Sequence, residues 1–309
     1  MLGYIFRNIF SSIVNIVAVV ILTFLLMNLL PSDPILIRLG ARYNEKDAQV
    51  LREKYGLDKP LYFQIYRYFI DVLNGEFGIS IVNGENINEL LKKRFPKSFL
   101  LILISFFFSL PFIPLGIYIA YTNKKGVSTK IEQFLVMLSS IPLFVVSSLI
   151  IFISSFFLKL SLTSKTGIPG LENYILPAFI LSITPSFLIF KTIKDTMAFV
   201  LQQTFILAHR SFGFKESTIL FKFALKNCAI PVITLLGNLS AYYLSMIYVV
   251  EYMFSIGGIG TLAVSSALNY DTPVVMAIII VVSIIYNLVN VLTKLLLPIF
   301  DRRVLYESL

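Results

Sequence analysis

The last apolar run of the chain reads PVVMAIIIVVSIIYNLVNVLTKLLLPIF (residues 273–300), and its only charged side chain is Lys294, near its end. An α-helix rises 1.5 Å per residue, so a run of this length is long enough to cross a hydrocarbon layer of about 30 Å. The run therefore predicts a transmembrane helix.

Five other apolar runs accompany it, near residues 9–30, 98–121, 131–160, 174–190 and 230–250. The whole chain of 309 residues is 57% hydrophobic and only 14% charged, whereas about a quarter of the residues of a soluble domain are charged. One globular core cannot hide so much apolar surface, so a bilayer must solvate part of it. We expect an all-α, multi-pass protein of the cytoplasmic membrane with about six transmembrane helices, several of them kinked by proline.

The runs divide the chain into three parts. Residues 1–30 form an N-terminal transmembrane helix, which is too long for the core of a typical signal peptide. Residues 31–96 form an extracytoplasmic segment in which we predict two short helices, at 45–55 and 61–73. The second helix has apolar residues at helical spacing and should lie on the membrane or on the helix bundle. Residues 97–309 form a core of five helices, with a cytoplasmic loop at 191–230.

Basic residues set the predicted orientation. Eleven Lys and Arg residues lie in the connections after spans two, four and six, whereas the two short connections on the other side offer only Lys165. The positive-inside rule then places both termini in the cytoplasm. The net charge of +9 is explained by this bias and by anionic lipid headgroups. It is not gathered into a basic domain, so nucleic-acid binding is disfavoured.

The chain lacks the residue patterns of common enzymes. It has one cysteine, Cys228, and one histidine, His209, and no G-x-x-x-x-G-K-[ST] phosphate loop. No metal-ligand spacing or catalytic triad motif occurs, so we expect no catalytic, cofactor or metal site. The central parts of the runs also lack charged residues and histidine. This absence disfavours a carrier coupled to protons or sodium, although an ATP-independent carrier or channel stays open as an alternative. Energy for uphill transport must come from another subunit.

The segment at 205–231 carries the most functional information. A helical stretch leads into Gly213, and a second helix of about 215–227 places three lysines on one stripe. Its apolar face consists of Ile219, Leu220, Phe223 and Ala224. A short amphipathic helix after a glycine turn can dock into a groove on a partner protein, or it can bind lipid headgroups. The residues alone leave both possibilities open.

This segment resembles the cytoplasmic coupling loop, or EAA loop, of ABC importer permeases. Leu207-Ala208-His209, Gly213 and Phe223-Ala224-Leu225 occupy the motif positions. The chain as a whole resembles the dipeptide/oligopeptide/nickel branch of these permeases. The supporting blocks, in order, are PSDP at 31–34, YGLDKPLY at 55–62, EFGIS at 76–80, NCAIPVITLLG at 227–237, EYMFS at 251–255, GIG at 258–260, NYDTPVV at 269–275 and DRR at 301–303. The chain departs from the family pattern at Phe212, where a basic residue is common, and at Gly257, where proline is usual.

The resemblance implies a type I ABC importer permease that forms half of a translocation pathway for di- or oligopeptides, with nickel or a metal chelate as the alternative cargo. The implied partners are a second homologous permease, two cytoplasmic ATPase subunits that hydrolyse ATP, an extracytoplasmic solute-binding protein and membrane lipids. The residues implied for the ATPase-coupling loop are Leu207, Ala208, His209, Arg210, Gly213, Phe214, Glu216, Ile219, Leu220 and Leu225.

Four residues of this loop are the expected groove contacts, namely Phe214, Glu216, Ile219 and Leu220. Gly213 would supply the turn, or serve only as a helix C-cap. Arg210 would contact the partner, or a lipid headgroup. The residues implied for the outer surface that receives the binding protein are Asp33, Glu251, Gly258, Gly260 and Asp271. The three acids among them could instead be solvated loop acids and turn formers.

Overall fold

The structure is a computed structural model, and it describes residues 2–29, 44–55, 58–122, 125–157 and 172–300. Within these ranges the chain is helical and contains no β-strand. The elements are α1 (Leu2–Leu29), α3 (Glu45–Tyr55), α4 (Leu61–Leu73), α5 (Ile87–Ser109), α6 (Phe112–Thr122), α7 (Lys125–Ser140), α8 (Leu143–Phe157), α9 (Glu172–Leu201), α10 (Thr204–Ser211), α11 (Glu216–Thr218), η2 (Ile219–Ala224), α12 (Leu225–Met253), α13 (Ile259–Leu268) and α14 (Thr272–Phe300).

The described residues contain five helices that are long and apolar enough to cross a membrane, or six if one bent pair is a single span. They are α1, the joined α5 and α6, α9, the continuous helix Glu216–Met253, and α14. The bent pair consists of α7 and α8. The prediction of an all-α protein with about six apolar spans is confirmed.

The predicted run at 131–160 is broken in two by a bend of 90° between α7 and α8. Pro142 lies at this bend, and its carbonyl accepts the N–H groups of Val145 and Val146, which open α8. Proline has no N–H to donate and clashes with the preceding turn, so the helix cannot continue through it. A kink was predicted here, and the bend is sharper than a kink.

The two short helices between the first two spans begin and end at the predicted residues, 45–55 and 61–73. Some helices of the core extend beyond their apolar runs. α5 begins at Ile87 rather than at residue 98, and α9 ends at Leu201 rather than at residue 190. Hydrophobicity marks the part of a helix that lies in lipid, and the helix itself continues beyond that part.

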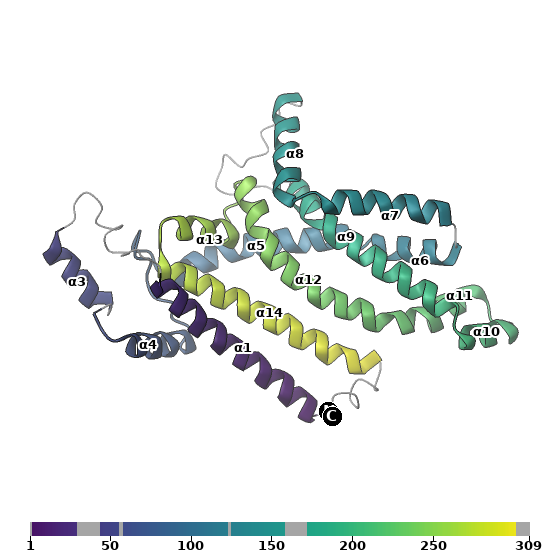
Figure 1. The fold of residues 1–309 in the computed structure, drawn as a ribbon, viewed down its shortest axis with the longest axis horizontal. Coiled ribbons are helices and arrows are strands. Elements are labelled where there is room, and N and C mark those ends of the chain that lie inside the picture. The colour runs from purple at the N-terminus through teal and green to yellow at the C-terminus, as the bar shows by residue number, and fades with distance from the viewer. Residues whose placement is uncertain (1, 30–43, 56–57, 123–124, 158–171, 301–309) are drawn as a thin grey trace.

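The core forms where α9 packs against α5, α6 and α12, while α1 packs against α14 (Figure 1). Its buried side chains include Leu101 of α5, Leu181 and Ile189 of α9, and Leu239 and Tyr243 of α12. The helices α10 and α11 lie at one end of the molecule, and α13 and α4 lie toward the opposite end (Figure 1). These two ends hold the candidate functional residues.

Candidate functional site

The turn at Gly213 ends α10 with two defined hydrogen bonds. The Gly213 N–H donates to the Arg210 carbonyl at 3.0 Å, and the Phe214 N–H donates to the His209 carbonyl at 3.2 Å. This pair is a Schellman motif, which needs a left-handed residue, and Gly213 has a φ of +79°. A Cβ atom at this position would meet nothing within 4 Å. Glycine is therefore required here by the backbone conformation and not by lack of space.

Arg210 and Glu216 bridge the two sides of this turn. The Arg210 Nε donates to Glu216 Oε1 at 2.9 Å, and a second guanidinium nitrogen donates to Oε2 at 3.3 Å. Such a two-point pair fixes geometry better than a single contact does. The sequence suggested separate external partners for these two residues, and the structure joins them to each other.

The His209 side chain packs α10 against the helix that follows. Its ring centroid lies 3.9 Å from that of Phe223 and 5.5 Å from that of Phe214, and its Nδ1 lies 2.5 Å from the Phe205 carbonyl oxygen. The lone histidine of the chain is thus a packing residue of this turn. Together, Arg210, Glu216, His209 and the aromatic rings give the turn a defined shape.

The apolar face of the second helix packs into the protein itself. Ile219, Ala224 and Cys228 are fully buried in a cluster with Ile206 and Met197. Leu220, Phe223 and Leu225 are partly buried against the same cluster. Ile219 consequently leaves no side-chain surface for the groove contact that the sequence suggested.

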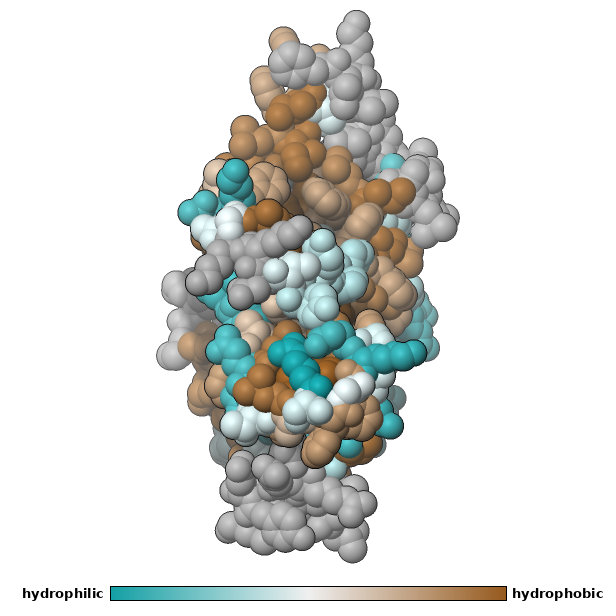
Figure 2. Space-filling view, turned by 90° about the vertical axis from the view of Figure 1, so that its right-hand side faces the viewer, coloured by the Kyte–Doolittle hydropathy of each residue, from teal (hydrophilic) through white to brown (hydrophobic). Residues whose placement is uncertain are grey.

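The exposed surface of this end has a different composition. Its exposed side chains are Leu207, Ala208, Arg210, Phe212, Phe214, Lys215, Phe221 and Lys222. Phe212 is 79% exposed, although a phenyl ring gains from burial. Figure 2 looks onto this end and shows hydrophilic residues beside hydrophobic ones. A surface of exposed aromatic rings beside an arginine is typical of a protein interface.

The predicted separate helix at 215–227 is part of a longer one. α11, η2 and α12 form a single helix of 38 residues, Glu216–Met253. A π-helical turn at Ile219–Ala224 joins the two α-helical parts, and the Leu225 N–H donates to the Leu220 carbonyl five residues back. Such π segments often occur at functional sites. The helix is about 57 Å long at 1.5 Å per residue, and it connects the Gly213 turn with the opposite end of the molecule.

Glu251 lies near the far end of this helix, and its side chain is fully buried. Its Oε1 accepts a hydrogen bond from the Ser98 hydroxyl at 2.5 Å, and its Oε2 accepts one from the Thr261 N–H at 3.1 Å. The Ser98 Oγ also accepts the Ile259 N–H at 2.8 Å. Ser98 and Glu251 thus cap the free N–H groups that open α13. Glu251 is neither a solvated loop acid nor an exposed contact residue.

The glycines at the start of α13 allow this close approach. A Cβ at Gly258 would collide with the Glu251 carboxylate and the Ser98 hydroxyl, and a Cβ at Gly260 would lie 2.5 Å from the Tyr248 Cα. The predicted outer-surface glycines therefore serve to pack the segment against α5 and α12. Ser255, in the turn before α13, has a φ of +55°. Non-glycine residues adopt this conformation at a cost and only where their surroundings fix it.

Asp271 lies in the connection between α13 and α14 and fixes the end of α13 that is opposite to Glu251. It is nearly fully buried, and its carboxylate accepts hydrogen bonds from the Ser80 hydroxyl and from the Ile81 N–H. Asp271 thus ties the segment before α5 to the start of α14, instead of standing in solvent. A polar pocket of about 270 Å³ adjoins it, and its lining includes Ser80, Glu85, Arg94, Ser266 and Asn269. Asp33 lies outside the described residues.

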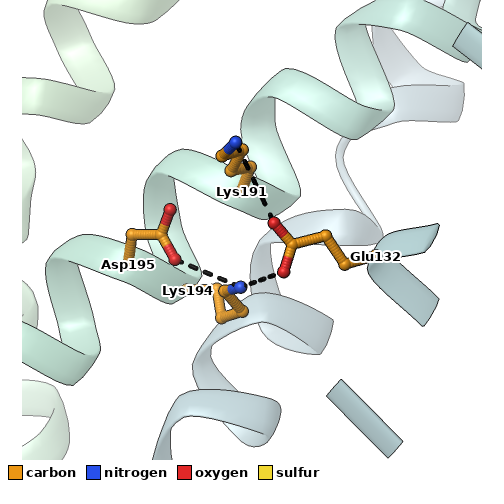
Figure 3. A network of polar contacts seen from close by, with 4 residues as sticks. All are labelled: Glu132, Lys191, Lys194 and Asp195. Atoms are coloured by element: carbon orange, nitrogen blue, oxygen red, sulfur yellow. Dashed lines mark hydrogen bonds and ion pairs between the residues drawn. The ribbon is translucent and has the colours of Figure 1, made fainter. Parts of the chain in front are cut away.

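A charged network that the sequence did not predict joins α7 to α9 (Figure 3). The Lys194 Nζ lies 2.5 Å from Glu132 Oε2 and 3.2 Å from Asp195 Oδ1, and the Lys191 Nζ lies 3.9 Å from Glu132 Oε1. Glu132 is the second residue of the apolar run at 131–160. Only the spacing of Lys191, Lys194 and Asp195 along one helix face could have suggested a partner.

No group of three or more His, Cys, Asp and Glu side chains among the described residues could hold a metal ion. The site is therefore best described as two packed ends joined by one helix. One end is the exposed Gly213 turn, and the other is the buried assembly of Ser98, Glu251 and the first turn of α13.

Comparison with known proteins places the chain in a family. Residues 112–306 match the family described as binding-protein-dependent transport system inner membrane component, and residues 1–102 match the N-terminal part of such membrane components.

Curated relatives span nearly the whole chain. The oligopeptide transport system permease protein AppB of Bacillus subtilis is 32% identical over 99% of this chain and 100% of its own. The probable peptide ABC transporter permease protein y4tP of Sinorhizobium fredii is 29% identical over 98% and 99%. The glutathione transport system permease protein GsiC of Escherichia coli K12 is 27% identical over 99% and 100%. This chain therefore belongs to the family of binding-protein-dependent transport system inner membrane components, and it is a multi-pass protein of the cytoplasmic membrane.

Proposed function

We propose that this chain is the permease subunit of an ATP-binding cassette importer and forms half of the pathway by which di- or oligopeptides enter the cell. The second half comes from a homologous permease, the energy comes from two cytoplasmic ATPase subunits, and an extracytoplasmic binding protein delivers the solute. The relatives support the cargo class, because their names refer to oligopeptides, peptides and glutathione.

The observation that carries the mechanism is the continuous helix Glu216–Met253. It begins three residues after the Gly213 turn and holds Glu251 near its end, hydrogen-bonded to α13 and to Ser98 of α5. The helix contains a π-helical turn at Ile219–Ala224 and a proline, Pro231, but no loop. A displacement at the Gly213 turn is therefore passed along the helix to the α13 end.

In this mechanism the Gly213 turn docks on an ATPase subunit. The exposed rings of Phe212 and Phe214 enter the partner's groove, and Arg210 and Glu216 hold the turn in its docking shape. Closure of the ATPase subunits around ATP pulls this end of the helix. At the other end, the capped first turn of α13 follows and changes the opening toward the binding protein.

Reconstitution tests this proposal. Proteoliposomes that contain this chain, its partner permease, the ATPase subunits and the binding protein should accumulate labelled peptide only when ATP is present. Omission of the ATPase subunits should abolish uptake. Uphill uptake by this chain alone would refute the proposal, and competition by a nickel chelate but not by peptides would refute the cargo assignment.

A point variant tests the docking surface separately. Phe212→Ser should greatly reduce copurification of the ATPase subunits while membrane insertion stays intact. Phe6→Ser removes a ring of similar exposure from α1 and should leave copurification unchanged. Equal copurification by the two variants would exclude the turn as the docking site.

A further inference from the structure

Helix α4 (Leu61–Leu73) has no buried residue, and one of its faces is both exposed and apolar. The side chains exposed on this face are Tyr62, Phe63, Tyr66, Ile70 and Leu73, with Arg67 at its border. Tyr62, Tyr66 and Leu73 are 75%, 64% and 72% exposed. Large apolar side chains gathered on one face mark an interaction surface.

The opposite face of α4 is less exposed and has a mixed composition. It holds Gln64, Ile65, Tyr68, Asp71 and Val72, each of intermediate exposure. The Tyr68 ring lies 6.5 Å from the ring of Phe24 in α1, and burial raises the pKa of the Tyr68 phenol. α4 thus packs a mixed face toward α1 and leaves large apolar side chains exposed on its outward face, where a helix on a soluble protein carries polar ones.

The contact with Phe24 fixes how deep α4 lies. The apolar part of α1 runs over 21 residues, Phe6–Leu26, which corresponds to about 31 Å and matches the hydrocarbon thickness of a bilayer. Phe24 is in the last turn of this stretch. The residues of α1 around it, Leu22 and Leu26, are exposed and continue the lipid-facing surface toward α4.

The chemistry of α4 suits the boundary between headgroups and acyl chains. Tyrosine is enriched at that boundary because its ring is apolar and its hydroxyl is polar. The Lys59 Nζ, just before the helix, lies 4.6 Å from the centre of the Phe63 ring. Basic side chains beside aromatic rings can reach phosphate groups while the rings stay in lipid.

We propose that α4 is an interfacial anchor, lying in the plane of the membrane with Tyr62, Tyr66 and Leu73 in the acyl-chain boundary and Lys59 and Arg67 among the lipid phosphates. The occupant of this face is lipid. The anchor holds the segment between the first two spans at the membrane surface, close to the α13 end of the pathway.

The chain has no tryptophan, so a single introduced tryptophan reports on one position. Tyr66→Trp on the outward face is the probe, and Asp71→Trp on the opposite face of α4 is the matched control. Ile13→Trp, in the middle of α1, is the reference for a position deep in the lipid. Phe212→Trp, at the Gly213 turn, is the reference for a position away from lipid. Each full-length variant is placed in nanodiscs whose phosphatidylcholine carries bromine either near the acyl carbonyl or near the chain centre.

The expected result is that shallow bromine quenches Tyr66→Trp about twice as strongly as deep bromine does, as for residues of an aromatic belt. Ile13→Trp should show the reverse order, and Asp71→Trp should be quenched less than Tyr66→Trp by both lipids. Quenching of Tyr66→Trp no greater than that of Phe212→Trp would overturn the proposal. Added binding protein or partner permease that removes the quenching would also overturn it, because the face would then belong to a protein.

Discussion

Substitution of Gly213 gives the sharpest test of the proposed docking role of the Gly213 turn. Gly213 has a φ of +79°, and a Cβ there would contact nothing within 4 Å. The penalty of a substitution is therefore the left-handed backbone alone, about 1–2 kcal/mol for an ordinary residue. Asparagine tolerates this conformation, and valine is among the residues least suited to it.

These backbone penalties lower the affinity of the permease for the ATPase subunit. If the ATPase subunit binds only the turn as observed, its apparent Kd rises by the factor by which that conformation is depopulated. A penalty of 1.4 kcal/mol corresponds to a factor of ten. This factor is an upper limit, because it is reached in full only where another conformation of the turn is nearly as stable as the observed one. We therefore expect a rise of less than about threefold for Gly213→Asn and of up to about tenfold for Gly213→Val. The measurement is a titration of nanodisc-embedded permease with the purified ATPase subunit.

The chain offers a matched control at Gly75, which ends α4 with a φ of +77°. Its N–H donates to the Val72 carbonyl, the Glu76 N–H donates to the Asp71 carbonyl, and a Cβ there also meets nothing within 4 Å. Gly75→Val thus carries the same local penalty at the other end of the protein and should leave ATPase affinity unchanged. Equal affinities of Gly213→Asn and Gly213→Val, or an equal loss in Gly75→Val, would refute the reasoning.

Three further predictions concern stability, each measured as the thermal midpoint of the purified protein in detergent. Glu251→Leu should destabilise by about 1–3 kcal/mol, because the buried Ser98 hydroxyl and the Thr261 N–H lose their acceptor; an unchanged midpoint would contradict the capping role. Gly237→Ala should destabilise, because its Cβ would lie 2.6 Å from the Thr293 side chain, and Thr293→Ala should restore part of the midpoint, because the Thr293 Cβ would still lie 3.0 Å away; no rescue at all would argue against that contact. Glu132→Gln and Lys194→Ala should show a coupling energy of about 0.5–3 kcal/mol in a double-mutant cycle, and additive effects would mean that the pair in Figure 3 contributes nothing.

Much of the fold follows from the sequence because the bilayer imposes a strong pattern. The apolar runs predict the spans, and the two short helices at 45–55 and 61–73 coincide with α3 and α4. Helix ends beyond the lipid are harder to predict. α9 continues past its apolar run to Leu201, because polar residues form helix as readily outside the membrane as apolar ones do inside it.

The candidate site is only partly predictable, for a physical reason. Sequence identifies Gly213 as a turn and Glu251 as an isolated acid at the end of a run. It does not show that Glu251 meets Ser98, a residue of another helix, or that Ile219 turns inward. The sequence does not distinguish a buried glutamate from an exposed one, because burial depends on how helices that are distant in the sequence pack together.

The uninterrupted helix from Glu216 to Met253 also acts as a ruler. Each residue inserted into it would turn everything beyond the insertion by about 100° and lengthen it by about 1.5 Å. Inserting one residue after Thr234 would swing Glu251 away from α13, although neither end had been altered. Length changes that surface loops absorb freely are therefore costly along this stretch unless a π-helical turn, like the one at Ile219–Ala224, takes up the extra residue. Chimaeras of related permeases should accordingly exchange it whole.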